Sequence, residues 1–153
     1  MLILRFCLLL AGAALVPSWR PLAAQPPAST AVSFDFVVVA NNTGLPAVTI
    51  ADIRRIFRGE QSLWPTKQAV TVVLPSVRTD FTDLFARQAL GMTRSGMQRF
   101  WLALVFQGRA NPPVLQDSAA DVIAFVQRTP GAIGMVPTAT PGIPRALVIR
   151  VRE

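Results

Sequence analysis

Two segments about seventy positions apart constrain the fold of this chain most strongly. The first, residues 49–59, repeats apolar residues at helical spacing behind Thr49, a residue that suits a helix cap, and it ends at Gly59. The second, residues 129–136, places the helix-stopping pair Pro130-Gly131 directly before a short apolar run. Gly134 within that run indicates the close approach of another backbone or of a ligand. A helix that leads into a short buried strand is the unit of a layered α/β domain, which the sequence therefore predicts.

The first two dozen residues have the pattern of an export signal. Arg5 supplies the positive start, residues 6–16 are apolar, and small residues end the segment at Ala24. The apolar stretch is too short for a permanent membrane span, so none is expected after cleavage. We expect a signal peptide over residues 1–24, a flexible leader over 25–31 and one domain over 32–153. These features predict a periplasmic or secreted protein.

The composition excludes most catalytic chemistry from the exported part of the chain. The single cysteine, Cys7, lies inside the signal segment, and the chain has neither histidine nor tyrosine. Disulfides, metal sites built on Cys or His, and catalytic pairs that use His are therefore excluded there. We expect a protein that is not an enzyme and that needs no cofactor or metal.

The chain is basic, with 15 Lys and Arg residues against 8 Asp and Glu residues and a net charge of +7. Lys67 is the only lysine. Arginine offers planar, bidentate hydrogen bonding to phosphate, sulfate and carboxylate. Nucleic acid is not expected as a partner, because the protein is predicted to be exported and its arginines do not form one run. Two interpretations remain: dispersed charge that keeps the protein soluble, or a face that attracts anions.

Periodicity and turn residues predict alternating helices and strands with no internal repeat. The first strand is nearly all apolar, as buried parallel strands are. The helix over 93–107 carries Leu102 and Phe106 beside its apolar stripe, so it is either buried between layers or presents a face to a partner. The helix that Thr79 is expected to cap has Phe81, Leu84, Phe85 and Ala89 on its buried side. The expected elements are strand 34–40, helix 49–58, strand 69–74, helix 79–90, helix 93–107, helix 118–129, strand 132–136 and strand 146–151.

Three loops are candidates for a ligand site, because open α/β sheets bind ligands beyond the carboxyl ends of their strands. They are residues 41–44, 75–79 and 137–142. The middle loop combines the hydroxyls of Ser76 and Thr79, the guanidinium of Arg78 and the start of a helix, a combination that favours an anion. Taken alone, Ser76 and Thr79 are better explained as ordinary polar residues before a helix, with Thr79 as its cap.

The two constraining segments also resemble a known family. A helix with a Gly-x4-Trp tail at Gly59 and Trp64, followed later by Pro-Gly-Ala-Ile-Gly at residues 130–134, is similar to the phosphate-type substrate-binding proteins of bacterial ABC transporters, in a shortened one-lobe form. The resemblance implies a single-lobe periplasmic-binding-protein-like (type 2) layered α/β domain, with a small, mostly parallel or mixed sheet flanked by helices. In that family the loop after this strand carries an Arg and a Ser-Gly-Thr turn that wraps an oxyanion. The turn glycine is absent here.

The resemblance implies an exported solute-binding-like protein that recognises an inorganic oxyanion such as phosphate or sulfate. Ser76, Arg78 and Thr79 would bind the anion, with Asn42 and Thr43 as the opposing edge. A membrane transporter, receptor or sensor is the implied partner. Because full-length relatives grip the anion between two lobes, the alternative is a non-catalytic periplasmic interaction module that keeps the fold while its ligand site has decayed.

Four further residues have weaker assignments. Asp80 and Asp83 are candidates to accept the proton of a monoprotonated phosphate. Asp117 is interpreted as a solvated loop residue beside the helix cap at Ser118. Trp64 is interpreted as a packing anchor, with a stacking surface as the alternative.

Overall fold

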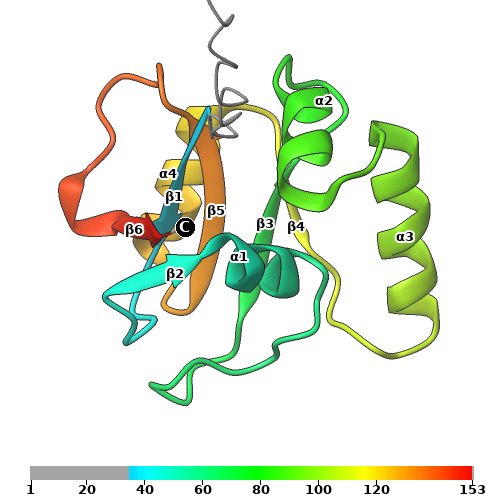
Figure 1. Ribbon diagram of the computed structural model, residues 1–153, viewed down its shortest axis with the longest axis horizontal. Coiled ribbons are helices and arrows are strands. Elements are labelled where there is room, and N and C mark those ends of the chain that lie inside the picture. The colour runs from blue at the N-terminus through cyan, green and yellow to red at the C-terminus, as the bar shows by residue number, and fades with distance from the viewer. Residues whose placement is uncertain (1–34, 153) are drawn as a thin grey trace, which may run out of the picture. The chain divides into compact units, whose positions relative to one another are not determined.

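The computed structural model describes residues 35–152, which form one six-stranded mixed sheet with helices on both faces (Figure 1). The strands lie in the order β2-β6-β1-β5-β3-β4. The predicted α/β class, with a mixed sheet flanked by helices, is confirmed. The predicted signal peptide and leader lie outside the described residues. Between residues 35 and 152, no helix is long and apolar enough to cross a membrane.

The elements alternate along the chain much as the periodicity predicts. They are β1 (Phe36–Ala40), β2 (Ala47–Thr49), α1 (Ile50–Phe57), β3 (Thr71–Pro75), α2 (Thr82–Phe85), a π-helical turn (Ala86–Leu90), α3 (Arg94–Phe106), β4 (Val114–Gln116), α4 (Ala119–Arg128), β5 (Ala132–Pro137), a 3-10 turn (Arg145–Leu147) and β6 (Val148–Arg152).

Helix α1 begins where the sequence predicts because Thr49 and Asp52 cap it reciprocally. The Thr49 hydroxyl accepts from the Asp52 N–H at 3.1 Å, and the Asp52 carboxylate accepts from the Thr49 N–H at 3.0 Å. The hydrogen bonds from the Thr49 backbone and side chain lower the pKa of Asp52 below its ordinary value. The ionised form therefore stabilises the folded state at neutral pH, and this contribution is lost as the pH falls through the lowered pKa.

The central strands alternate their side chains between two apolar layers. Val38 of β1, Leu74 of β3 and Met135 of β5 face α1, the π-helical turn and α3, whereas Val39 and Val73 face α4. Gly134 lies under α4, where an added Cβ would meet the Val122 side chain at 2.6 Å. The close approach that the sequence indicates at this glycine is thus the packing of α4 on the sheet.

The direction of β1 differs from the expectation. The prediction of a parallel strand is wrong, because β1 pairs antiparallel with both β5 and β6. β1 is nearly all apolar because it lies in the middle of the sheet with both faces covered, and such burial does not depend on strand direction. As a result, the loop over residues 41–44 leaves the sheet at the end opposite to the loop that follows β3.

The predicted helix over 79–90 is also irregular. Helix α2 begins at Thr82 without a side-chain cap, so the prediction that Thr79 caps it is wrong. The π-helical turn then inserts an extra residue and rotates the buried face. Phe85 and Ala89 are buried as predicted, but Leu84 is 40% exposed. Gly91, at φ +69°, ends the segment as expected.

Helix α3 resolves the two interpretations of its wide apolar surface. Thr93 caps it by accepting from the Gly96 N–H at 3.1 Å, and its inner face is buried through Met97, Trp101 and Leu104. Leu102 is 59% exposed and Phe106 is 82% exposed. One face of α3 packs on the domain, and a second apolar face remains open to solvent.

Gly131 lets us test the junction between α4 and β5. It has φ +82°, and an added Cβ would meet the Ala69 carbonyl oxygen at 2.3 Å. We expect Gly131→Ala to lower the free energy of unfolding by on the order of 3 kcal/mol or more, measured by denaturant titration. Gly142→Ala is the control, because Gly142 has a similar φ of +73° but open space around it, and it should cost about 1 kcal/mol. Equal losses of unfolding free energy in the two variants would contradict a role for the steric clash between the added Cβ and the Ala69 carbonyl.

Candidate functional site

The loop between β3 and α2 brings together three of the five residues predicted to bind a ligand: Ser76, Arg78 and Thr79. It leaves the sheet at the boundary between β3 and the edge strand β4. The Ser76 N–H donates to the Gln116 carbonyl at 2.8 Å and so extends the pairing of the two strands by one residue. The loop is therefore fixed at its first residue by the sheet itself.

Asp117, which follows β4, contacts two donors from this loop. The Ser76 hydroxyl donates to one oxygen of the Asp117 carboxylate, and the Arg78 guanidinium lies 3.3 Å from the other. The Arg78 backbone N–H donates in turn to the Ser76 hydroxyl at 3.1 Å. The side chains of Arg78 and Asp117 are 80% and 56% exposed. The interpretation of Asp117 as a merely solvated residue is wrong, because its two oxygens meet a hydroxyl and a guanidinium that converge on one anionic group.

Thr79 has a structural role inside this loop. Its hydroxyl donates to the Ser76 carbonyl at 2.6 Å, and the Thr82 hydroxyl lies 2.5 Å from the same carbonyl oxygen and 2.7 Å from the Thr79 hydroxyl. Thr79 is 6% exposed and Thr82 is fully buried. These contacts hold the backbone under Ser76 and leave the Thr79 hydroxyl little access to a ligand.

Asn42 and Thr43 do not join this cluster, because β1 is antiparallel to β5 while β3 is parallel to it. They lie beyond the carboxyl end of β1, at the opposite end of the sheet. The Thr43 hydroxyl accepts from the Leu45 N–H at 3.2 Å, and the Asn42 carbonyl accepts from the Thr66 hydroxyl at 2.9 Å. The first contact stabilises a local turn, and the second joins this turn to the loop that carries Thr66.

The two candidate proton acceptors have different surroundings. Asp83 forms two hydrogen bonds with the Arg94 guanidinium, at 2.7 and 3.1 Å. Arg94 also donates to the Val77 carbonyl at 3.1 Å, so this ion pair braces the loop. Asp80 is exposed. Within residues 35–152, no group of three carboxylates, cysteines or histidines is placed to hold a metal ion.

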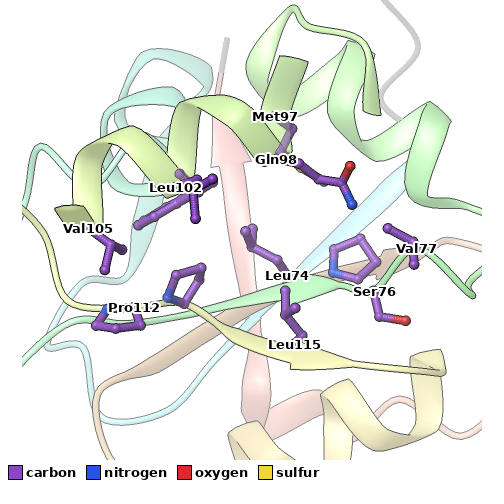
Figure 2. Close-up of a pocket in the computed structure, with 12 residues that line it drawn as sticks. Leu74, Ser76, Val77, Met97, Gln98, Leu102, Val105, Pro112 and Leu115 are labelled. Carbon is purple, nitrogen blue, oxygen red and sulfur yellow. The ribbon is translucent and has the colours of Figure 1, made fainter. Parts of the chain in front are cut away.

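An open apolar groove of about 340 Å³ adjoins the Ser76 loop. It runs between α3 and the end of the β3–β4 pair (Figure 2). Figure 2 shows Val77, Ser76 and the amide of Gln98 at one end of the groove and Pro112 at the other. The lining residues are Leu74, Pro75, Ser76, Val77, Met97, Gln98, Trp101, Leu102, Val105, Pro112, Pro113 and Leu115.

Trp64, which belongs to the family-like segment after α1, is a packing anchor. Trp64 is 3% exposed, and its indole N–H donates to the Gly131 carbonyl at 2.8 Å. This bond joins the tail of the first predictive segment to the second segment, and the ring has no face open for stacking.

Comparison with known proteins gives similarity to solved structures only. No protein-family model matches the chain, and no curated protein matches it either. The chain is similar to an ABC-type phosphate transport receptor from Vibrio cholerae, with a TM-score of 0.49 and 14% identity, over 76% of this chain and 46% of that one. It is also similar to a structure assigned to a phosphate ABC transporter substrate-binding protein with bound phosphate from Clostridium perfringens, with a TM-score of 0.49 and 16% identity, over 77% and 44%. The chain spans less than half the length of each.

Asp117 is the residue of the site that the sequence interpretation missed. It follows a three-residue strand, Val114–Gln116, which lies next to β3 and runs parallel to it. The rule that ligand-binding groups gather at the carboxyl ends of neighbouring parallel strands would have paired Asp117 with Ser76 if that strand had been recognised.

The support beneath the loop is testable at Thr82. We expect Thr82→Val to lower the free energy of unfolding by about 1–3 kcal/mol, because it removes a buried hydroxyl from the Ser76 carbonyl and from its partner Thr79. Thr66→Val is the control, since the Thr66 hydroxyl forms an exposed hydrogen bond and its loss should cost less than about 0.5 kcal/mol. Chemical denaturation measures both. A neutral Thr82→Val would contradict the structural role assigned here to the threonine pair.

Proposed function

We propose that this protein is an exported, non-catalytic recognition domain that binds an oxyanion at the Ser76–Arg78 loop. One observation carries the proposal: a hydroxyl and a guanidinium, two residues apart, meet the two oxygens of a single carboxylate. Hydrogen bonds from charged donors to an anionic oxygen are about twice as strong as neutral ones, so such a pair can hold an oxyanion without a metal. Phosphate and sulfate are the first ligands to test, and the role suggested is that of an accessory to a transporter or sensor.

Accessibility supports the same assignment. The Arg78 side chain is 80% exposed and makes its ion pair with only one of its terminal nitrogens. A guanidinium carries five N–H donors, so Arg78 can meet an incoming anion while Asp117 remains beside it. Asp117 competes for the same donors and repels an anion, and a site of this kind in water is expected to be weak.

The test compares two variants that have opposite expected effects. We expect Arg78→Ala to weaken sulfate and phosphate binding by about tenfold or more, because the charged hydrogen bond is lost. Asp117→Ala should strengthen binding by on the order of tenfold, because the competing carboxylate is removed. Isothermal titration calorimetry at fixed ionic strength, with chloride as the reference anion, measures both.

Arg150→Ala is the matched control for charge. Arg150 is an exposed arginine in β6, which two other strands separate from β3. This variant should bind as the wild type does. Equal weakening by Arg78→Ala and Arg150→Ala would show a diffuse effect of net charge and would refute a site at the loop.

Asp117 also favours a second candidate function. Its carboxylate already satisfies Ser76 and Arg78 from within the chain, as expected of an interaction module whose ligand site has decayed. The two functions differ in the response of Asp117→Ala. Wild-type binding that strengthens in this variant supports the oxyanion site, whereas a wild-type protein that binds no anion supports the module.

Export is tested separately. We expect the protein, expressed with its own N-terminus in a Gram-negative host, to accumulate in the periplasm with Gln25 as its first residue, because residues 1–24 have the three-part pattern of a signal peptide. Fractionation and N-terminal sequencing measure this. An uncleaved chain in the cytoplasm would contradict it.

A further inference from the structure

The groove beside the loop is larger and more apolar than an inorganic anion needs. Its volume is about 340 Å³. Volumes of this order are typical of sites for small organic ligands. Ten of its lining residues have apolar side chains, and Ser76 and Gln98 are the polar ones. The groove therefore offers an apolar surface to the body of a ligand.

The groove has a polar end. Ser76 and Val77 belong both to its wall and to the loop that carries Arg78. Figure 2 shows the Gln98 amide at this same end, whereas Leu102, Val105 and Pro112 lie toward the other. The loop that carries Arg78, the Ser76 hydroxyl and the Gln98 amide thus lie at one end of an apolar groove, and this arrangement is complementary to a molecule with an anionic head and an apolar body.

The ring of Trp101 belongs to the wall of the groove and is 5% exposed. Its signals should therefore respond to a ligand that lies in the groove.

We propose that the groove binds a monomeric amphiphilic organic anion. Its carboxylate or phosphate head meets Ser76 and Arg78, and its unbranched or small apolar body lies between α3 and β4. This inference rests on the proposed oxyanion site, because the head group uses the same two residues. It adds the chemical class of the ligand: an organic acid or an organic phosphate in place of a bare inorganic ion.

A set of three small probes separates head from body. Octanoate carries both parts, acetate only the head, and octanol only the body. The protein is purified in the form that the expressing cell produces after any signal cleavage. We expect it to bind octanoate at least tenfold more tightly than acetate or octanol. In a ¹H–¹⁵N spectrum octanoate should shift the Trp101 indole N–H, whereas that of Trp64, which donates to the Gly131 carbonyl, should stay in place.

Leu102→Asp tests the groove without removing a buried side chain, because Leu102 is 59% exposed. It should weaken octanoate binding at least tenfold and leave acetate binding unchanged. Leu63→Asp is its control, since Leu63 is 58% exposed and does not line the groove. Arg78→Ala should weaken octanoate binding without affecting octanol.

The outcomes distinguish this proposal from the one on which it rests. Acetate and sulfate binding that depends on Arg78, with octanoate no tighter, would overturn the groove proposal and leave the oxyanion site standing. No binding by any probe would overturn both. Octanol binding as tight as octanoate binding would refute the charged head. Wild-type dimers in sedimentation that Leu102→Asp dissociates would show that a second copy of the chain covers the groove, which also overturns the proposal.

Discussion

The backbone of Gly131 is the constraint on which the rest of the structure depends. Its carbonyl accepts from the Thr71 N–H at 3.0 Å and from the Trp64 indole at 2.8 Å, and its N–H donates to the Asn41 carbonyl at 2.8 Å. The Asn41 side chain then donates to the last turn of α4, at the carbonyls of Val126 and Gln127. One glycine thus joins three central strands, a long loop and a helix. Its φ of +82° and the Ala69 carbonyl beside it leave no room for a side chain.

This junction sets the register that positions the site. β3 starts opposite β5, with Thr71 beside Ala132, and runs parallel to it away from the junction. Five residues later it delivers Ser76 to the far end of the sheet, where the parallel neighbour β4 delivers Asp117. The two partners of the site are 41 residues apart in sequence, and they meet because both strands end at the same edge. The geometry of the site is therefore a consequence of strand direction.

The sequence predicted what local chemistry determines. The caps at Thr49 and Ser118 and the stops at Gly59 and Gly91 depend on residues within one or two turns, and the helices next to them were found. Strand direction depends on pairing between distant segments, so the antiparallel β1 was missed. The strands β2 and β4 have three residues each, too few to show a period. The π-helical turn after Phe85 packs against α1 and α3, and no local sequence pattern predicted it.

The contrast between local and long-range interactions also explains which parts of the candidate site could be predicted from the sequence. Ser76, Arg78 and Thr79 were predicted together because they are neighbours in sequence, but their roles depend on contacts that the sequence does not show. Thr79 lies against the Ser76 carbonyl and supports the loop, whereas Arg78 remains exposed. Asn42 and Thr43 were placed opposite them by the family resemblance, and the loop over residues 41–44 was a candidate because it follows a strand that was expected to be parallel. Once β1 is antiparallel, the second wall beside Ser76 must come from elsewhere in the chain. Helix α3 supplies it, and its exposed apolar face makes that wall apolar. A reversed strand at the centre of the sheet therefore changes the chemistry expected of a ligand at its edge.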